Sequence, residues 1–135
     1  MRQFPIPHEP YDGSVEETPL VQLWYGLLAD SLKRKYERLH VLPPETSQTF
    51  SIRAYAQGAC ENAMAPPAKI YPAFLRRLKA MASFNLARRL PIERGRFLFA
   101  DRGAVFEIGV TVEARADGSE EAVIDLPSEA IANEE

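Results

Sequence analysis

The chain has 135 residues, of which 46% are hydrophobic and 26% charged, and its formal net charge is −3 at pH 7. This length fits one domain, and the composition is that of a globular protein with enough apolar side chains for a core. The slight acidity excludes a global positive field that would attract nucleic acid or anionic lipid. The single cysteine, Cys60, excludes an internal disulfide and a cysteine-cluster metal site.

No segment reaches the run of about 20 apolar residues that a membrane helix needs, and the first residues lack the apolar stretch of a secretory signal. We therefore expect a cytoplasmic protein without membrane insertion. Residues 1–17 contain three prolines and no sustained apolar periodicity, which predicts a flexible Pro-rich arm. The folded domain is expected to span residues 18–127, and residues 128–135 are expected to form an acidic, disordered tail.

The first half of the domain is predicted to begin with a helix. Thr18 suits an N-cap and Pro19 suits the first helical position. From there to about Lys35, apolar residues recur at spacings of three and four, which predicts one buried face. Residues 39–42 then form a short apolar run before a double proline, and residues 49–55 alternate in polarity. Both are typical of strands, and we expect the two to pair.

A second helix is predicted to begin at Tyr71–Pro72, because Phe74, Leu78 and their neighbours again repeat at helical spacing. Residues 88–96 contain four arginines, a proline and a glycine, and are interpreted as a basic connection. The last third has strand character. Residues 97–99, 105–112 and 122–126 are predicted strands, separated by the turn signals Asp101-Arg102-Gly103 and Asp117-Gly118.

These elements predict an α+β fold in which two main helices pack on a mostly antiparallel sheet of five or six strands. The hairpin region from Arg96 to Leu126 should be the best-formed part of the sheet. The apolar positions of the helical and strand patterns define the expected core, namely Leu23, Trp24, Leu27, Ile52, Phe74, Leu78, Phe106, Ile108, Val110 and Ile124.

The sequence lacks the usual signatures of catalysis. Neither His8 nor His40 has a second ligand at metal-binding spacing, and Cys60 has no neighbours that would activate a thiol. No Gly-Lys pair occurs, so the phosphate-cradling loop of nucleotide hydrolases is absent. We therefore expect no enzyme activity, no metal and no cofactor. The segment whose side chains could bind an anion is Arg76–Arg102, which contains eight basic residues and two acidic ones.

The order of motifs resembles the N2 domain, the N-terminal ATPase-associated domain of type II secretion and type IV pilus assembly ATPases. The helix Pro19-Leu-Val-Gln-Leu and the strand that ends His40-Val-Leu-Pro43 come first. Arg53-Ala-Tyr55-Ala-Gln57-Gly58 follows, similar to the family's Arg-x-Arg-x-Asp-Gly strand with the second arginine and the aspartate replaced. Further matches are Arg77-Leu-Lys79-Ala-Met-Ala, Arg88-Arg89-Leu-Pro-Ile-Glu-Arg-Gly95-Arg96, the strand 106–112 and the Gly118 turn.

In that family the domain precedes a RecA-type motor domain, and N2 arginines reach the nucleotide phosphates that the motor holds. The resemblance therefore implies contact with a nucleotide, a phosphate or a partner for the residues that match family arginines, which are Arg53, Arg77, Arg89 and Arg96. It implies a non-catalytic N2-like domain that acts as a protein-interaction or regulatory module, with a secretion or pilus ATPase or another cytoplasmic component as its partner.

Three other interpretations remain open at this point. The Arg76–Arg102 segment could bind nucleic acid or another anion, with Phe97, Phe99 and Phe106 as stacking groups. A helix lying across a curved sheet could hold a small ligand. The chain could also be an excised fragment of a full secretion ATPase.

Overall fold

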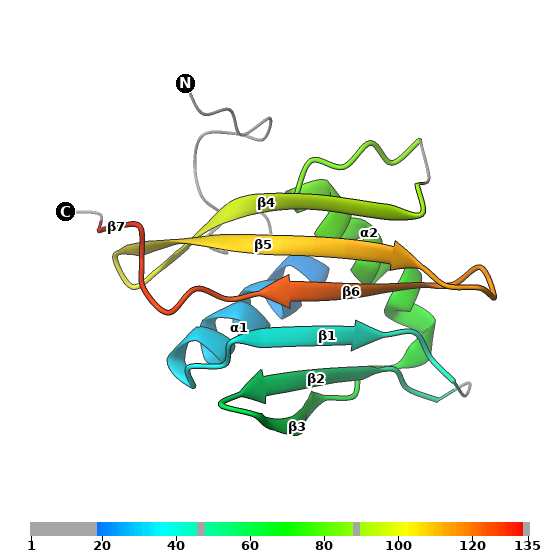
Figure 1. Cartoon of the computed structure of the whole chain (residues 1–135), viewed down its shortest axis with the longest axis horizontal. Helices are drawn as coiled ribbons and strands as arrows, with labels where there is room; N and C mark the ends of the chain where they lie inside the picture. The colour runs from blue at the N-terminus through cyan, green and yellow to red at the C-terminus, as the bar shows by residue number, and fades with distance from the viewer. Residues whose placement is uncertain (1–18, 46–47, 88–89, 134–135) are drawn as a thin grey trace.

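The computed structural model describes residues 19–45, 48–87 and 90–133. These residues form one antiparallel sheet with two α-helices packed on it (Figure 1), so the predicted α+β class is confirmed. The arm predicted at residues 1–17 lies outside the described residues, and so do the last two residues of the predicted tail. No helix in the described part of the chain has both the length and the apolarity to cross a membrane.

The sheet has six main strands and one short one within the described residues. In spatial order the main strands are β3 (Ala59–Met64), β2 (Ser51–Ala56), β1 (Arg38–Leu42), β6 (Glu120–Asp125), β5 (Ala104–Ala114) and β4 (Ile92–Asp101), while β7 (Ala132–Asn133) pairs with β5. The predicted pairing of the strands at 39–42 and 49–55 is confirmed by β1 and β2. Because β1 also pairs with β6, the sheet joins the two halves of the chain.

Two tight turns fix the register of hairpins. Gln57 and Gly58 join β2 to β3, and Arg102 and Gly103 join β4 to β5, and all four residues have positive φ. Positive φ at both central residues is the requirement of a type I′ turn, whose twist matches that of the strands it connects.

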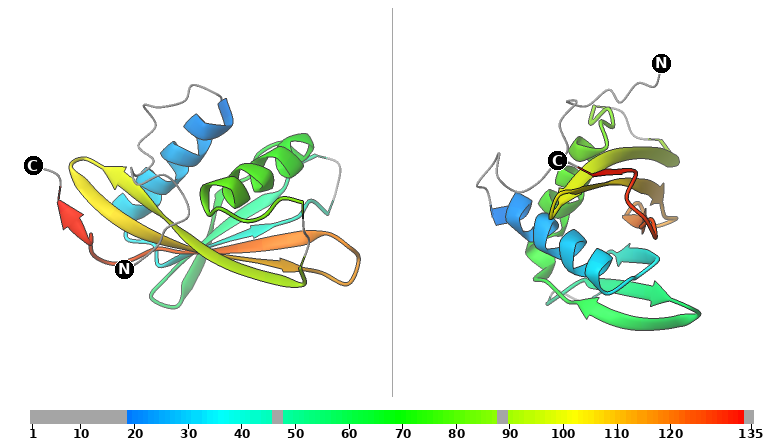
Figure 2. Two further views of the ribbon diagram at one scale, coloured as in Figure 1. Left: turned by 90° about the horizontal axis from the view of Figure 1, so that it is seen from above. Right: turned by 90° about the vertical axis from the view of Figure 1, so that its left-hand side faces the viewer.

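Both helices lie on the same face of the sheet (Figure 2). Helix α1 (Pro19–Lys33) confirms the predicted start at Pro19, and it ends before Lys35, which takes a positive φ of 66°. A single turn of 3-10 helix, η1 (Ala68–Ile70), leads into α2 (Tyr71–Met81), which begins at the predicted residue.

The core lies between the helices and the sheet. The rings of Trp24 on α1 and Phe74 on α2 stack with centroids 4.1 Å apart, and the indole Nε1–H donates a hydrogen bond of 3.0 Å to the Phe74 carbonyl oxygen. Most of the predicted core residues are buried. Leu23 and Phe106 are the two exceptions, because each packs against the margin of the core and stays partly exposed.

Two predictions about the sheet were incomplete or wrong. Residues 88–96 were interpreted as a connection, but β4 already begins at Ile92 and includes Gly95. The strand β3 was not predicted, because its residues 59–62 are all exposed at the edge of the sheet and show no alternation. Cys60 lies in this edge strand.

Tyr71 gives the fold a predictable sensitivity to alkaline pH. Its side chain is buried at the start of α2, where its O–H donates a hydrogen bond to the Glu120 carbonyl oxygen. Burial raises the pKa of Tyr71 most, and the negative charges of Glu120 and Glu121 raise it further. The folded state thus favours the neutral phenol. This stabilisation is complete below the unfolded pKa of about 10 and is lost as pH rises above it.

Tyr71→Phe should therefore flatten the fall in the free energy of unfolding between roughly pH 9 and pH 11. The measurement is urea denaturation of both proteins across this range. An identical pH dependence for the two would contradict the assignment.

Candidate interaction surface

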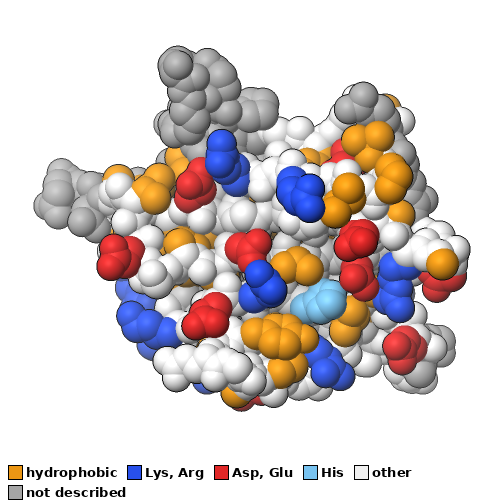
Figure 3. All heavy atoms as spheres, viewed as in Figure 1, with side chains coloured by type: hydrophobic (Ala, Val, Ile, Leu, Met, Phe, Trp, Pro, Cys, Tyr) orange, Lys and Arg blue, Asp and Glu red, His pale blue; other side chains and the backbone are white. Residues whose placement is uncertain are grey.

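The face of the sheet that the helices leave uncovered carries the candidate site. Because side chains alternate along a strand, the residues between the buried positions of β1, β2, β4, β5 and β6 point to this side. Figure 3 shows basic, acidic and hydrophobic side chains interspersed on this side around a histidine. We call it the open face, and its central residues are Arg38, His40, Arg53, Tyr55, Gly109, Thr111, Glu121, Val123 and Asp125.

Four residues of the neighbouring strands β1 and β2 lie together on the open face. In the β1–β2 register, Arg38 lies opposite Tyr55, and His40 lies opposite Arg53. We call these four residues the Tyr55 quartet. A depression of about 480 Å³ is lined by three of them together with Glu37 and Val123. Arg53 lines a second, smaller depression of about 210 Å³ where β1 ends and β2 begins.

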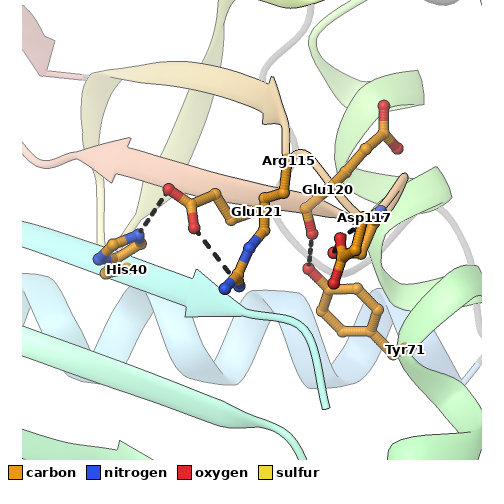
Figure 4. Close-up of polar contacts among 7 residues, drawn as sticks. His40, Tyr71, Arg115, Asp117, Glu120 and Glu121 are labelled. Carbon is orange, nitrogen blue, oxygen red and sulfur yellow. Dashed lines mark hydrogen bonds and ion pairs between the residues drawn. The ribbon is translucent and has the colours of Figure 1, made fainter. Parts of the chain in front are cut away.

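Ion pairs hold several of the charged side chains in place. Arg38 Nε lies 3.0 Å from Asp125 Oδ1. The carboxylate of Glu121 pairs with Arg115, whose Nη1 lies 3.6 Å from one oxygen, and its other oxygen lies 3.5 Å from His40 Nε2, a contact that is an ion pair only when the imidazole is protonated (Figure 4). Exposed pairs of this kind stabilise a fold by only about 0–1 kcal/mol each. Their main effect here is to orient the side chains of the open face.

The phenol of Tyr55 lies within electrostatic reach of two guanidinium groups. A hydrogen bond with Cys60 raises the pKa of Tyr55, and the positive charges of Arg53 and Arg38 act in the opposite direction. The quartet therefore combines two permanent cations with an imidazole and a phenol, all of which can donate hydrogen bonds.

The arginines predicted from the family resemblance do not gather at one place. Arg53 and Arg96 are both on the open face, but at opposite sides of the sheet, on β2 and β4. Arg96 Nε lies 3.3 Å from Glu107 Oε2. Arg77 is half-buried on α2, in the layer of helices, and Arg89 lies outside the described residues.

The sequence analysis did not identify the other three members of the quartet as site residues. Arg38 and His40, like Arg53 and Tyr55, are separated by one residue, which places each pair on one face of a strand. That spacing was a usable signal. The register that sets the two pairs opposite each other appears only in the structure.

The basic segment Arg76–Arg102 is dispersed in the structure. Arg76 and Lys79 lie on α2, whereas Arg94 is exposed on β4. Lys79 Nζ is 2.7 Å from Glu120 Oε1, and Arg102 Nε is 3.5 Å from Asp101 Oδ2. Of the aromatic residues considered for stacking on nucleobases, Phe97 and Phe99 are at most 1% exposed and Phe106 packs against the core. These placements argue against a nucleic-acid site.

Among the residues that the structure describes, no group of three or more histidine, cysteine or acidic side chains is arranged to hold a metal ion. The fold and the surface together define a small α+β domain with one sheet face under helices and the other presenting mixed charges around a tyrosine. No known protein-family profile matches the chain.

Individual proteins do match it. The chain is 35% identical over 79 residues to the type IV pilus assembly ATPase PilB of Myxococcus xanthus, a match that covers 58% of this chain and 14% of PilB. It is 28% identical over 103 residues to the type II secretion system protein E of Xanthomonas campestris, a match that covers 76% of this chain and 18% of that protein. It is 24% identical over 105 residues to the type II secretion system ATPase E of Vibrio cholerae, a match that covers 78% of this chain and 20% of that protein.

The chain is therefore related to a segment of the type II secretion and type IV pilus assembly ATPases, as the order of motifs predicted. It matches only 14–20% of the length of these relatives.

Proposed function

We propose that the chain is a non-catalytic, N2-like domain that acts in the cytoplasm as a protein-interaction or regulatory module of a secretion or pilus machine. Its partner would be a secretion or pilus ATPase or another cytoplasmic component. The observation that carries this proposal is that three such ATPases match up to 78% of the chain through a small part of their own length.

The residues support an interaction role over a catalytic one. The sequence has no Gly-Lys pair from which to build a phosphate-cradling loop. The open face instead offers a tyrosine surrounded by arginines, and Tyr and Arg are residue types enriched at protein interfaces. Ion pairs already orient Arg38 and Arg115, so less conformational freedom is lost when a partner binds.

The test is co-purification of the tagged chain from its native cell, followed by ATPase assays. We expect recovery of a secretion or pilus component, and a change in the ATPase rate of the cell's own motor when the chain is added. We also expect no ATP turnover by the isolated chain. Recovery of no such component together with an unchanged motor rate would reject the proposal, and so would hydrolysis that is lost in an Arg77→Ala variant.

A further inference from the structure

Two exposed arginines of the open face, Arg53 on β2 and Arg94 on β4, have no ion-pair partner among the residues that the structure describes. Arg38 is balanced by Asp125, and Arg115 by Glu121. The cross-strand neighbours of Arg53 are His40 on β1 and Asn62 on β3, neither of which carries a negative charge. An anion from outside the domain could therefore bind Arg53 without displacing an existing pair.

The surroundings of Arg53 provide further donors and an apolar wall. The Tyr55 phenol and the Arg38 guanidinium lie next to it on the same two strands, where only the Nε of Arg38 is held by Asp125. Val123 lines the depression of about 480 Å³ with Tyr55 and with His40, the cross-strand neighbour of Arg53. Arg53 itself lines the separate depression of about 210 Å³, together with Glu45. A short acidic side chain would thus find donors for its oxygens and apolar contacts for its methylene groups.

The local charge selects a monoanion. Glu37 lines the depression of about 480 Å³, Glu45 lines the depression to which Arg53 contributes, and Glu121 and Asp125 lie nearby on β6. A phosphate group or a nucleoside triphosphate would bring several negative charges close to these four carboxylates while gaining one uncompensated cation. A carboxylate brings a single charge, which Arg53 matches.

We infer that the Tyr55 quartet is a docking site for an acidic side chain of a protein partner, with Arg53 pairing with its carboxylate. This inference rests on the proposed function, because it names the kind of partner surface that the domain binds. The contact is bidentate where the guanidinium plane faces both carboxylate oxygens, which lysine cannot reproduce.

The experiment compares Arg53→Ala with Arg94→Ala. Arg94 is a matched control, because it is an exposed arginine of β4 at the far edge of the sheet from Arg53. Arg53→Ala should raise the Kd for the secretion or pilus component recovered by co-purification at least about tenfold, as expected for loss of a charged hydrogen bond. Arg94→Ala should bind as the unmodified chain does, and Arg53→Lys should recover only part of the affinity.

A second measurement does not depend on finding that component. The ¹⁵N-labelled chain is titrated with a millimolar blocked peptide, acetyl-Ala-Leu-Glu-Leu-Ala-amide, and with its glutamine counterpart. The glutamate peptide should shift the amide resonances of Arg53, His40 and Tyr55, and the glutamine peptide should not. Equal shifts by both peptides, persistence of the shifts in Arg53→Ala, or tighter binding of ATP at the same resonances would overturn the inference.

The two proposals fail in different ways. Recovery of a component with unchanged affinity for Arg53→Ala would leave the proposed function intact and remove the carboxylate site. Recovery of no component, together with an unchanged ATPase rate of the motor, would remove the proposed function, whatever the peptides do.

Discussion

Trp24→Ala should destabilise the domain by about 3–5 kcal/mol, the usual cost of removing a buried tryptophan side chain. The indole is 1% exposed, stacks on Phe74 and donates a hydrogen bond to the Phe74 carbonyl oxygen. The substitution leaves a cavity between the two helices and a buried carbonyl without its donor. Since domains of this size are stable by about 5–15 kcal/mol, a large part of the folding free energy would be lost.

Urea denaturation followed by circular dichroism measures this change. Gly26→Ala is the matched control on the same helix, because a Cβ at position 26 would meet no atom within 4 Å. Alanine is favoured over glycine in a helix by about 0.5–1 kcal/mol, so this variant should be slightly more stable than the unmodified chain. Similar urea midpoints for Trp24→Ala and Gly26→Ala would show that the stack does not hold α1 to α2.

The parts of the fold that could be predicted are those in which local pattern and packing agree. Helix α1 begins at Pro19 and α2 at Tyr71, as predicted, because their apolar residues repeat at helical spacing and proline lies at or near each start. The edge strand β3 was missed because an edge strand exposed along its length leaves no alternation in the sequence. Gly95 and Pro91 were interpreted as signs of a connection, but packing places Gly95 inside β4.

The candidate site was predictable only in part. Arg53 was found through the family resemblance, yet its neighbours in the quartet depend on strand register. Arg38 pairs with Asp125, which is 87 residues away along the chain. That contact follows from the pairing of β1 with β6, a long-range choice that no local pattern specifies.

Gly95→Ala should destabilise the domain by about 1–3 kcal/mol, the range expected for an overpacked site. A Cβ at this position would lie 2.6 Å from Phe84 Cε1 and 3.1 Å from the Ala82 carbonyl oxygen. The phenyl ring can rotate away. The carbonyl is less free, because the backbone just after α2 is fixed by hydrogen bonds from the Ala82 and Phe84 amides to the Leu78 and Lys79 carbonyl oxygens.

Gly109→Ala is the matched control, since Gly109 also lies within a strand of the same sheet. Its Cβ would be 3.5 Å from Asp125 Cβ, an ordinary van der Waals contact. Alanine there reduces the conformational entropy of the unfolded chain without a clash, so it should leave the stability unchanged or raise it by up to about 1 kcal/mol. If urea denaturation shows that the free energy of unfolding falls for Gly95→Ala and rises for Gly109→Ala, packing at position 95 requires a residue without a side chain. A loss of stability that is equal for the two variants would instead indicate a general intolerance of the strands to alanine.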